Sequence, residues 1–205
     1  MSKTIMDKWK QMMIKAETHD ILKAAKQSLS ESENRHFSFS DVIITLIGKR
    51  LLFSISNPAV RDYIKEYSNE LMKDERVLGM ILFGSIAEGT WDNYSDIDLF
   101  IITKGKPLDI IHKTNEIDKK LKAQQEKLLD MGLGLYVSPF VVSVDELDEF
   151  RPIYLDIVDK GIVLYERQKT VSNFIRDLRS KISYKRIKTL NGEVLKWKEK
   201  PRPMH

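Results

Sequence analysis

Two short apolar stretches joined by a polar loop constrain this chain more than any other feature. The first stretch, Val77–Phe83, runs into a Gly-Ser turn at Gly84, and the second, at 99–103, follows Asp96 and Asp98. Side chains alternate along a strand, so carboxylates two residues apart share one face of a sheet. Two like charges on an apolar strand are costly unless a cation neutralises them. The pattern therefore predicts two adjoining strands with a cation site where they meet.

The residues of this loop predict both a metal site and a phosphate site. Asp96 and Asp98 are oxygen ligands of the kind that a hard divalent ion prefers, most often Mg²⁺ and otherwise Mn²⁺. A Gly-Ser turn that opens a helix offers backbone N–H groups, the Ser85 hydroxyl and a positive helix end to a phosphate. Gly84 lets the chain approach that phosphate closely because it has no Cβ, and Gly89 can serve the same loop. Metal-binding carboxylates beside a phosphate cradle indicate nucleotidyl or phosphoryl transfer.

This segment resembles the nucleotidyltransferase superfamily related to DNA polymerase beta, in its small prokaryotic form. The family signature is a Gly-Ser turn followed after a short loop by Asp-x-Asp, and Gly84, Ser85, Asp96 and Asp98 fall on it. The resemblance implies an α+β fold, a small mixed sheet with helices packed on it. It also implies a Mg²⁺-dependent enzyme that moves a nucleoside monophosphate from a nucleoside triphosphate, such as ATP, to an acceptor. Asp96 and Asp98 would be the catalytic metal ligands, and Gly84, Ser85 and Gly89 would hold the nucleotide.

The chain departs from the family pattern on the next core strand. Members of the family usually carry a third carboxylate there, but the predicted strand at 133–143 contains no Asp or Glu. Asp130 precedes this strand, and Asp145 and Glu146 follow it. Losing a positioned general base typically costs about 10²–10⁴ in rate. The alternative function is therefore a catalytically degenerate nucleotide-sensing or DNA-binding regulator of the toxin–antitoxin type.

A second departure lies inside the Gly-Ser loop. Glu88 is acidic where many small prokaryotic members carry a basic residue. An acid there adds negative charge near the phosphates unless the metal or a C-terminal base offsets it, and the basic side chains from 181–202 are the candidates. The acceptor stays open among a protein, a small molecule and an RNA end.

The first quarter of the chain predicts a separate unit. Residues 11–16 read as a short extended segment, 17–29 as a helix, 30–36 as a polar connector, and 38–47 as a second helix capped by Ser38 or Ser40. This order resembles the ribbon–helix–helix modules of antitoxin-type repressors, in which two chains pair their strands in the major groove of DNA. The resemblance implies a homodimer that binds DNA through residues 1–55, with Gln11, Met13 and Lys15, or the alternate set, on the ribbon. A helical extension that packs on the catalytic domain or forms a dimer contact is the alternative.

We therefore expect two domains, a mostly helical N-terminal unit at 1–56 and a nucleotidyltransferase-like domain at 57–205. The second domain would end in a basic helix and a hairpin around the turn signal Asn191-Gly192. Pro139 predicts that the strand at 133–143 lies at a sheet edge or carries a bulge. The remaining predicted elements are helices at 59–74, 85–89, 108–130, 145–150, 153–158 and 171–180 and a strand at 162–165.

Charge and composition limit the partners. Residues 1–55 carry a net charge of +3, residues 56–162 carry −7 and residues 163–205 carry +8. The acidic middle contains the proposed metal site, and the basic ends could hold nucleotide phosphates or nucleic acid, or could be a solvated surface. The chain has no cysteine, no apolar run of membrane-spanning length and no signal-peptide core. We expect a cytoplasmic protein with no membrane partner.

Overall fold

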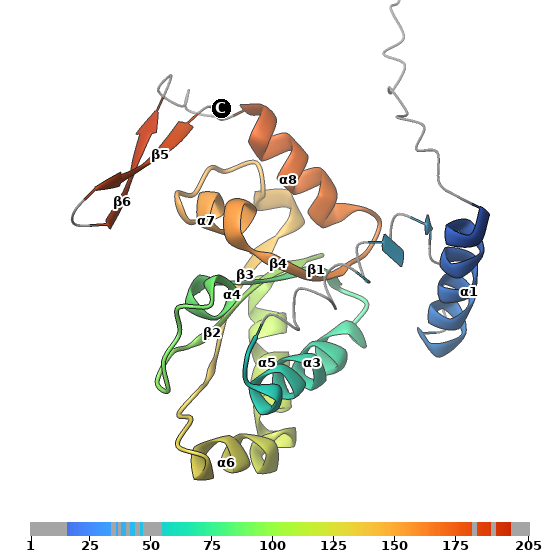
Figure 1. Ribbon diagram of the computed structural model, residues 1–205, viewed down its shortest axis with the longest axis horizontal. Helices are drawn as coiled ribbons and strands as arrows, with labels where there is room; N and C mark the ends of the chain where they lie inside the picture. Colours follow the sequence, from blue (N-terminus) through green and yellow to red (C-terminus); the bar gives the residue numbers. More distant parts are fainter. Residues whose placement is uncertain are drawn as a thin grey trace, which may run out of the picture. The chain divides into compact units, whose positions relative to one another are not determined.

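A computed structural model describes residues 16–33, 36, 38, 39, 42, 43, 46 and 55–181, together with the backbone of 184–189 and 192–197. The chain divides into two units, Met1–Ile44 and Thr45–His205. Figure 1 traces the helices and strands of both.

Helix α1, Ala16–Glu33, is the main described element of the first unit. The predicted helix at 17–29 is confirmed, but the polar connector expected from residue 30 is wrong at its start, because the helix continues for four more residues. Gln27 donates a hydrogen bond from Nε2 to Glu31 Oε1 at 2.9 Å, and such an i,i+4 pair stabilises an exposed helical turn. Polar composition therefore did not end the helix.

The second predicted helix, at 38–47, has a range that crosses the boundary between the two units, and it is described only at scattered positions. Phe39, Val42, Ile43 and Leu46 are helical, and the Val42 N–H donates to the Ser38 carbonyl oxygen at 3.1 Å. The Phe39 ring lies 5.4 Å from the ring of His19 on α1. The extended segment at 11–15, with the predicted ribbon positions Gln11, Met13 and Lys15, lies outside the described residues, so the ribbon–helix–helix interpretation stays a prediction.

The second unit is built on a four-stranded mixed sheet, as the sequence predicted. Its strands are β1 (Val77–Phe83), β2 (Ile97–Thr103), β3 (Val137–Ser143) and β4 (Ile162–Glu166), in the order β3-β2-β1-β4. Strand β1 is antiparallel to both β2 and β4, whereas β2 and β3 are parallel. Pro139 lies on the edge strand β3, where its missing N–H removes no hydrogen bond from the centre of the sheet.

Helices cover both faces of this sheet (Figure 1). On one face lie α3 (Pro58–Met72), α5 (Pro107–Lys120) and α6 (Lys122–Asp130), and on the other lie α7 (Ile153–Lys160) and α8 (Thr170–Lys181). Alternate residues of β2 pack on opposite faces of the sheet. Leu99 and Ile101 pack under α3 and α5, while Phe100 and Ile102 pack under α7 and α8. Both sides of the sheet are therefore buried.

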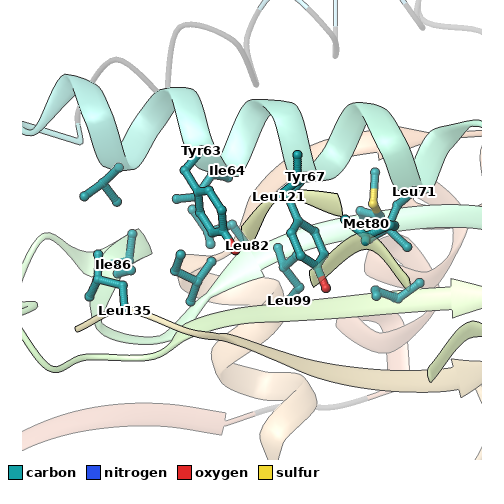
Figure 2. Packing of buried hydrophobic residues seen from close by; sticks show 14 of the residues in the cluster. Tyr63, Ile64, Tyr67, Leu71, Met80, Leu82, Ile86, Leu99, Leu121 and Leu135 are labelled. Carbon is teal, nitrogen blue, oxygen red and sulfur yellow. The ribbon is translucent and has the colours of Figure 1, made fainter. Parts of the chain in front are cut away.

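Helix α3 shows how the sequence produces this packing. Asn57 caps it by accepting hydrogen bonds at Oδ1 from the N–H groups of Ala59 (2.9 Å) and Val60 (3.3 Å), and Pro58 occupies the first turn, where it needs no donor. Its apolar side chains recur at helical spacing and point onto the sheet (Figure 2), where Tyr67 and Leu71 are fully buried. Each such buried side chain stabilises the fold by about 1.5–3 kcal/mol.

Two predicted helices differ from the observed ones. The single helix expected at 108–130 is two helices that meet at Leu121, whose φ and ψ of −93° and 12° leave the helical region while its side chain is almost fully buried. The break lets both helices place apolar residues on one core, which a straight, mostly polar helix would not do. The helix expected at 145–150 is a short 3₁₀ turn, Val144–Glu146, that follows β3 directly.

The predicted C-terminal hairpin is confirmed with a shifted start. Strands β5 (Tyr184–Thr189) and β6 (Gly192–Trp197) are antiparallel, with Thr189 opposite Gly192. Gly192 therefore begins the second strand, whereas the sequence placed it in the turn. Among the described residues, no helix has the length and apolar character needed to cross a membrane.

Candidate active site

The Gly-Ser turn and the Asp-x-Asp pair meet at one end of the sheet. Phe83, the last residue of β1, lies opposite Asp98 of β2. Gly84 follows with φ of +71°, a conformation that residues with a side chain rarely adopt. A Cβ on Gly84 would overlap Oδ2 of Asp98 and lie 3.1 Å from its Cγ. The Asp98 carboxylate therefore rests directly on the Gly84 backbone, and only glycine leaves it room.

The two carboxylates of the pair differ in exposure. Asp96 is exposed just before β2 begins, whereas Asp98 is half-buried within the strand. Burial, and secondarily the negative charge of Asp96, raises the pKa of Asp98. Each of these effects disfavours the charged form of Asp98, whereas a cation bound beside it would favour that form. The pair therefore fits a single hard divalent ion such as Mg²⁺, held by carboxylate oxygens.

The loop before the pair is held by a turn around Asp92. Its Oδ1 accepts hydrogen bonds from the Tyr94 N–H at 2.9 Å and the Ser95 hydroxyl at 3.1 Å. The Asn93 carbonyl oxygen accepts a bond from the Gly134 N–H at 2.7 Å, which ties the loop to the segment that leads into β3. These bonds fix the direction from which the chain enters Asp96. Trp91 packs against the core in the same loop, as a packing residue rather than an exposed one.

Helix α4, Gly84–Glu88, carries the Gly-Ser turn. Ser85 is half-buried in its first turn, and its carbonyl oxygen accepts a hydrogen bond from the Thr90 N–H at 3.0 Å. Gly89 ends the helix in the left-handed conformation, with φ of +74°, and nothing lies within 4 Å of where its Cβ would be. Gly89 therefore serves the backbone turn of this loop, while Gly84 makes close contact with a carboxylate.

A serine lies beside Asp98 on the strand where the sequence analysis looked for a third carboxylate. In the parallel register of β2 and β3, Asp98 lies opposite Ser138, and the two side chains share a face. Asp145 and Glu146 follow the end of β3 that is far from Asp98, so they do not replace that group, and Asp130 ends α6 before β3 begins. In the part of the chain that the structure describes, no three Asp, Glu, His or Cys side chains form a metal-binding group. Among the residues with described side chains, the candidate site therefore has two carboxylates.

A lysine that the sequence reading overlooked reaches the Gly-Ser loop. Lys160, the last residue of α7, places its Nζ 2.9 Å from Oε2 of Glu88. The sequence instead suggests basic residues from 181–202 as candidates to offset Glu88. Of these, Lys181 pairs instead with Asp148 at 2.9 Å, and the side chains beyond it lie outside the described residues. The 72-residue separation of Glu88 and Lys160 gives no local signal for the pair.

Comparison with known proteins decides the family. The family model of the nucleotidyltransferase domain matches residues 64–188, more than half of the chain, and spans the candidate site. The chain belongs to the nucleotidyltransferase family. The resemblance of the Gly-Ser and Asp-x-Asp segment to these enzymes is thereby confirmed, and so are the predicted fold class and enzyme class.

One curated relative and several solved structures are similar to this nucleotidyltransferase. The "Putative protein adenylyltransferase MJ1305" of Methanocaldococcus jannaschii is 30% identical over 127 residues, which are 60% of this chain and 80% of the relative. A toxin-antitoxin crystal structure with AMP-PNP is 16% identical, with a TM-score of 0.39 over 57% of this chain and 84% of that one. A mutant of the MntA-HpeT toxin-antitoxin is 15% identical, with the same TM-score and coverage.

Proposed function

We propose that this nucleotidyltransferase moves AMP from ATP to a hydroxyl group of a protein, using the Gly84–Ser85 turn and the Asp96–Asp98 pair. The observation that carries the proposal is the contact between the Asp98 carboxylate and the Gly84 backbone. It brings the residues suited to a metal and those suited to a phosphate together at the end of β1. The relative named as a protein adenylyltransferase supports the choice of nucleotide and acceptor.

In the proposed reaction an acceptor hydroxyl oxygen attacks the α-phosphorus of the nucleotide. A new P–O bond forms, the bond from the α-phosphorus to the bridging oxygen breaks, pyrophosphate leaves with that electron pair, and the hydroxyl proton passes to solvent. Asp96 and Asp98 would hold Mg²⁺, which stabilises charge on the phosphoryl oxygens when bound. Ser85 and the backbone after Gly84 would orient the phosphates.

The two-carboxylate site predicts a slow enzyme. Ser138 is neutral and cannot take the proton that a carboxylate beside Asp98 would accept. A positioned general base contributes about 10²–10⁴ in rate, so we expect turnover to be lower than in a three-carboxylate site by about that factor. Binding of the nucleotide does not depend on this group and should be retained.

Label transfer tests the proposal. The protein is incubated with Mg²⁺ and each of the four [α-³²P]nucleoside triphosphates in an extract of its source cells, and protein, RNA and small-molecule fractions are counted separately. We expect label from ATP alone in the protein fraction, resistant to nuclease. An Asp96→Ala/Asp98→Ala double variant should transfer none. Label in RNA or a small molecule would correct the acceptor, and undiminished transfer by the double variant would refute the site.

A nucleotide sensor without transfer is the second candidate, and Ser138 is the observation that favours it. Such a protein would bind Mg²⁺ and nucleotide at the same residues without labelling any fraction. Binding of DNA by residues 1–55 as a homodimer would make it a regulator. Loss of duplex affinity on deletion of residues 1–55, with steep salt dependence, would support that role.

A further inference from the structure

The ion pair between Glu88 and Lys160 joins two helices that lie far apart in the sequence. Glu88 is the last residue of α4 and Lys160 the last residue of α7, and their side chains are 30% and 31% exposed. An ion pair that is open to solvent contributes little to stability at most sites. Stability alone is therefore a weak reason for a lysine at this place.

Strand register places Lys160 at the same sheet end as the Gly-Ser turn. Leu82 of β1 lies opposite Ile162 of the antiparallel β4. Gly84 follows β1 and Lys160 comes shortly before β4, so α4 and the end of α7 lie at the same end of the sheet, where Lys160 and Glu88 form their ion pair. Because Phe83 lies opposite Asp98 on the other side of β1, the turn is flanked by Asp98 on one side and Lys160 on the other.

Close packing at Gly161 fixes the backbone next to Lys160. A Cβ on Gly161 would overlap the Ile157 carbonyl oxygen and the Cγ2 atom of Ile81 on β1. The Gly161 N–H also donates to the Ile157 carbonyl oxygen at 3.1 Å. The end of α7 is therefore pressed against β1, and the Lys160 side chain starts from a defined point beside the turn.

We propose that Lys160 binds the phosphate chain of the nucleotide at the Gly84–Ser85 turn, and that Glu88 holds the lysine there until the nucleotide displaces it. The proposal rests on the function proposed above. A triphosphate at this turn has Asp96, Asp98 and Glu88 around it, and a bound Mg²⁺ neutralises only part of that charge. A lysine ammonium is a compact charge on a flexible stem, so its Nζ can leave the Glu88 carboxylate for a phosphate oxygen without backbone motion.

Glu88 and Lys160 then have opposite effects on nucleotide affinity. Removing the lysine removes a charge-assisted hydrogen bond to phosphate, which should weaken binding at least tenfold. Removing the Glu88 charge frees the lysine and removes a repulsive charge, which should tighten binding. A purely structural ion pair would behave differently, because losing either partner would disturb the loop in the same direction.

Calorimetric titration of the full chain tests this, with Mg²⁺·ATP and with Mg²⁺ and inorganic tripolyphosphate, a probe that has no base. The variants are Lys160→Met, Lys160→Arg and Glu88→Gln. Lys113→Met is the matched control, because Lys113 also forms a 2.9 Å ion pair, with Glu116 on the exposed side of α5. We expect Lys160→Met to bind both probes at least tenfold more weakly, Lys160→Arg to stay within about threefold of the wild type, and Glu88→Gln to bind more tightly.

Other results would overturn the proposal in distinguishable ways. If Lys160→Met matches Lys113→Met while Asp98→Ala abolishes binding, the function stands and the role of Lys160 is refuted. If Glu88→Gln weakens binding as much as Lys160→Met, the pair is structural. If the wild type binds neither probe, the proposed function and this inference fail together.

Discussion

The contact between Gly84 and Asp98 predicts how two glycines of one loop should differ on replacement by alanine. Gly84 and Gly89 both have a positive φ, +71° and +74°, which costs an alanine about 1–2 kcal/mol. At Gly89 the added Cβ meets nothing within 4 Å, so the backbone cost is the whole cost. At Gly84 the Cβ also overlaps the Asp98 carboxylate, and overpacking typically adds about 1–3 kcal/mol.

We therefore expect Gly89→Ala to lower the free energy of unfolding by about 1–2 kcal/mol and Gly84→Ala to lower it by about 2–5 kcal/mol. At about 2–4 °C per kcal/mol for a chain of this size, the melting temperature should fall clearly further for Gly84→Ala. Urea unfolding and thermal melts in the absence of nucleotide measure both quantities.

A double-mutant cycle isolates the contact. In an Asp98→Ala background the obstructing carboxylate is gone, so the cost of Gly84→Ala should fall to that of Gly89→Ala, whose own cost should not change. Equal costs for the two glycine variants in the wild-type background would refute the placement of Asp98 on Gly84. An unchanged cost of Gly84→Ala in the Asp98→Ala background would refute it as well.

Three further predictions follow from single side chains. The pKa of Asp98 is raised in the folded state, so protonated Asp98 stabilises the metal-free protein below the ordinary pKa of this carboxyl. That stabilisation is lost as the pH rises through the raised pKa. In thermal melts Asp98→Asn should therefore melt above the wild type at pH 7, and the difference should vanish near pH 4. Among the described residues the buried Tyr154 hydroxyl has no hydrogen-bond partner, so Tyr154→Phe should raise the free energy of unfolding by about 1 kcal/mol, measured in urea. A loss of that size would instead show that the hydroxyl has a partner. Ser138→Asp should place a third carboxylate beside Asp98. We expect tighter Mn²⁺ binding in a calorimetric titration and label transfer that rises by up to about 10²-fold. Unchanged metal affinity would show that residue 138 does not face the pair.

Local signals in the sequence predict β1 with its observed limits and point to the candidate carboxylates, whereas the strand predicted at 133–143 begins only at Val137. Val77–Phe83 was predicted with its observed limits, because an apolar run bounded by polar residues and Gly84 has few other interpretations. Asp96 and Asp98 were chosen because their spacing puts them on one face of a strand, and the structure places Asp98 at the Gly-Ser turn. Pro139 was assigned to an edge because it lacks an N–H, and β3 is an edge strand.

Features set by tertiary packing could not be read from the sequence. The break at Leu121 depends on a common core for α5 and α6, while the local composition favours one continuous helix. Ser138 lies beside Asp98 because of the register of β2 and β3, which the sequence does not specify. The pairing of β1 with β4 brought Lys160 to the Gly-Ser loop from a distant part of the chain. Periodicity and turn chemistry carry no information about such contacts.

The central claim, that Gly84, Ser85, Asp96 and Asp98 form a metal-dependent nucleotide site, is tested most directly by calorimetric titration. ATP, GTP, CTP and UTP are titrated with and without Mg²⁺ into the wild type, Asp98→Ala and Asp145→Ala, the last being an exposed carboxylate beyond the far end of β3. We expect Mg²⁺-dependent binding of ATP that Asp98→Ala abolishes and Asp145→Ala retains. Absence of nucleotide binding by the wild type, or unchanged binding by Asp98→Ala, would contradict the account.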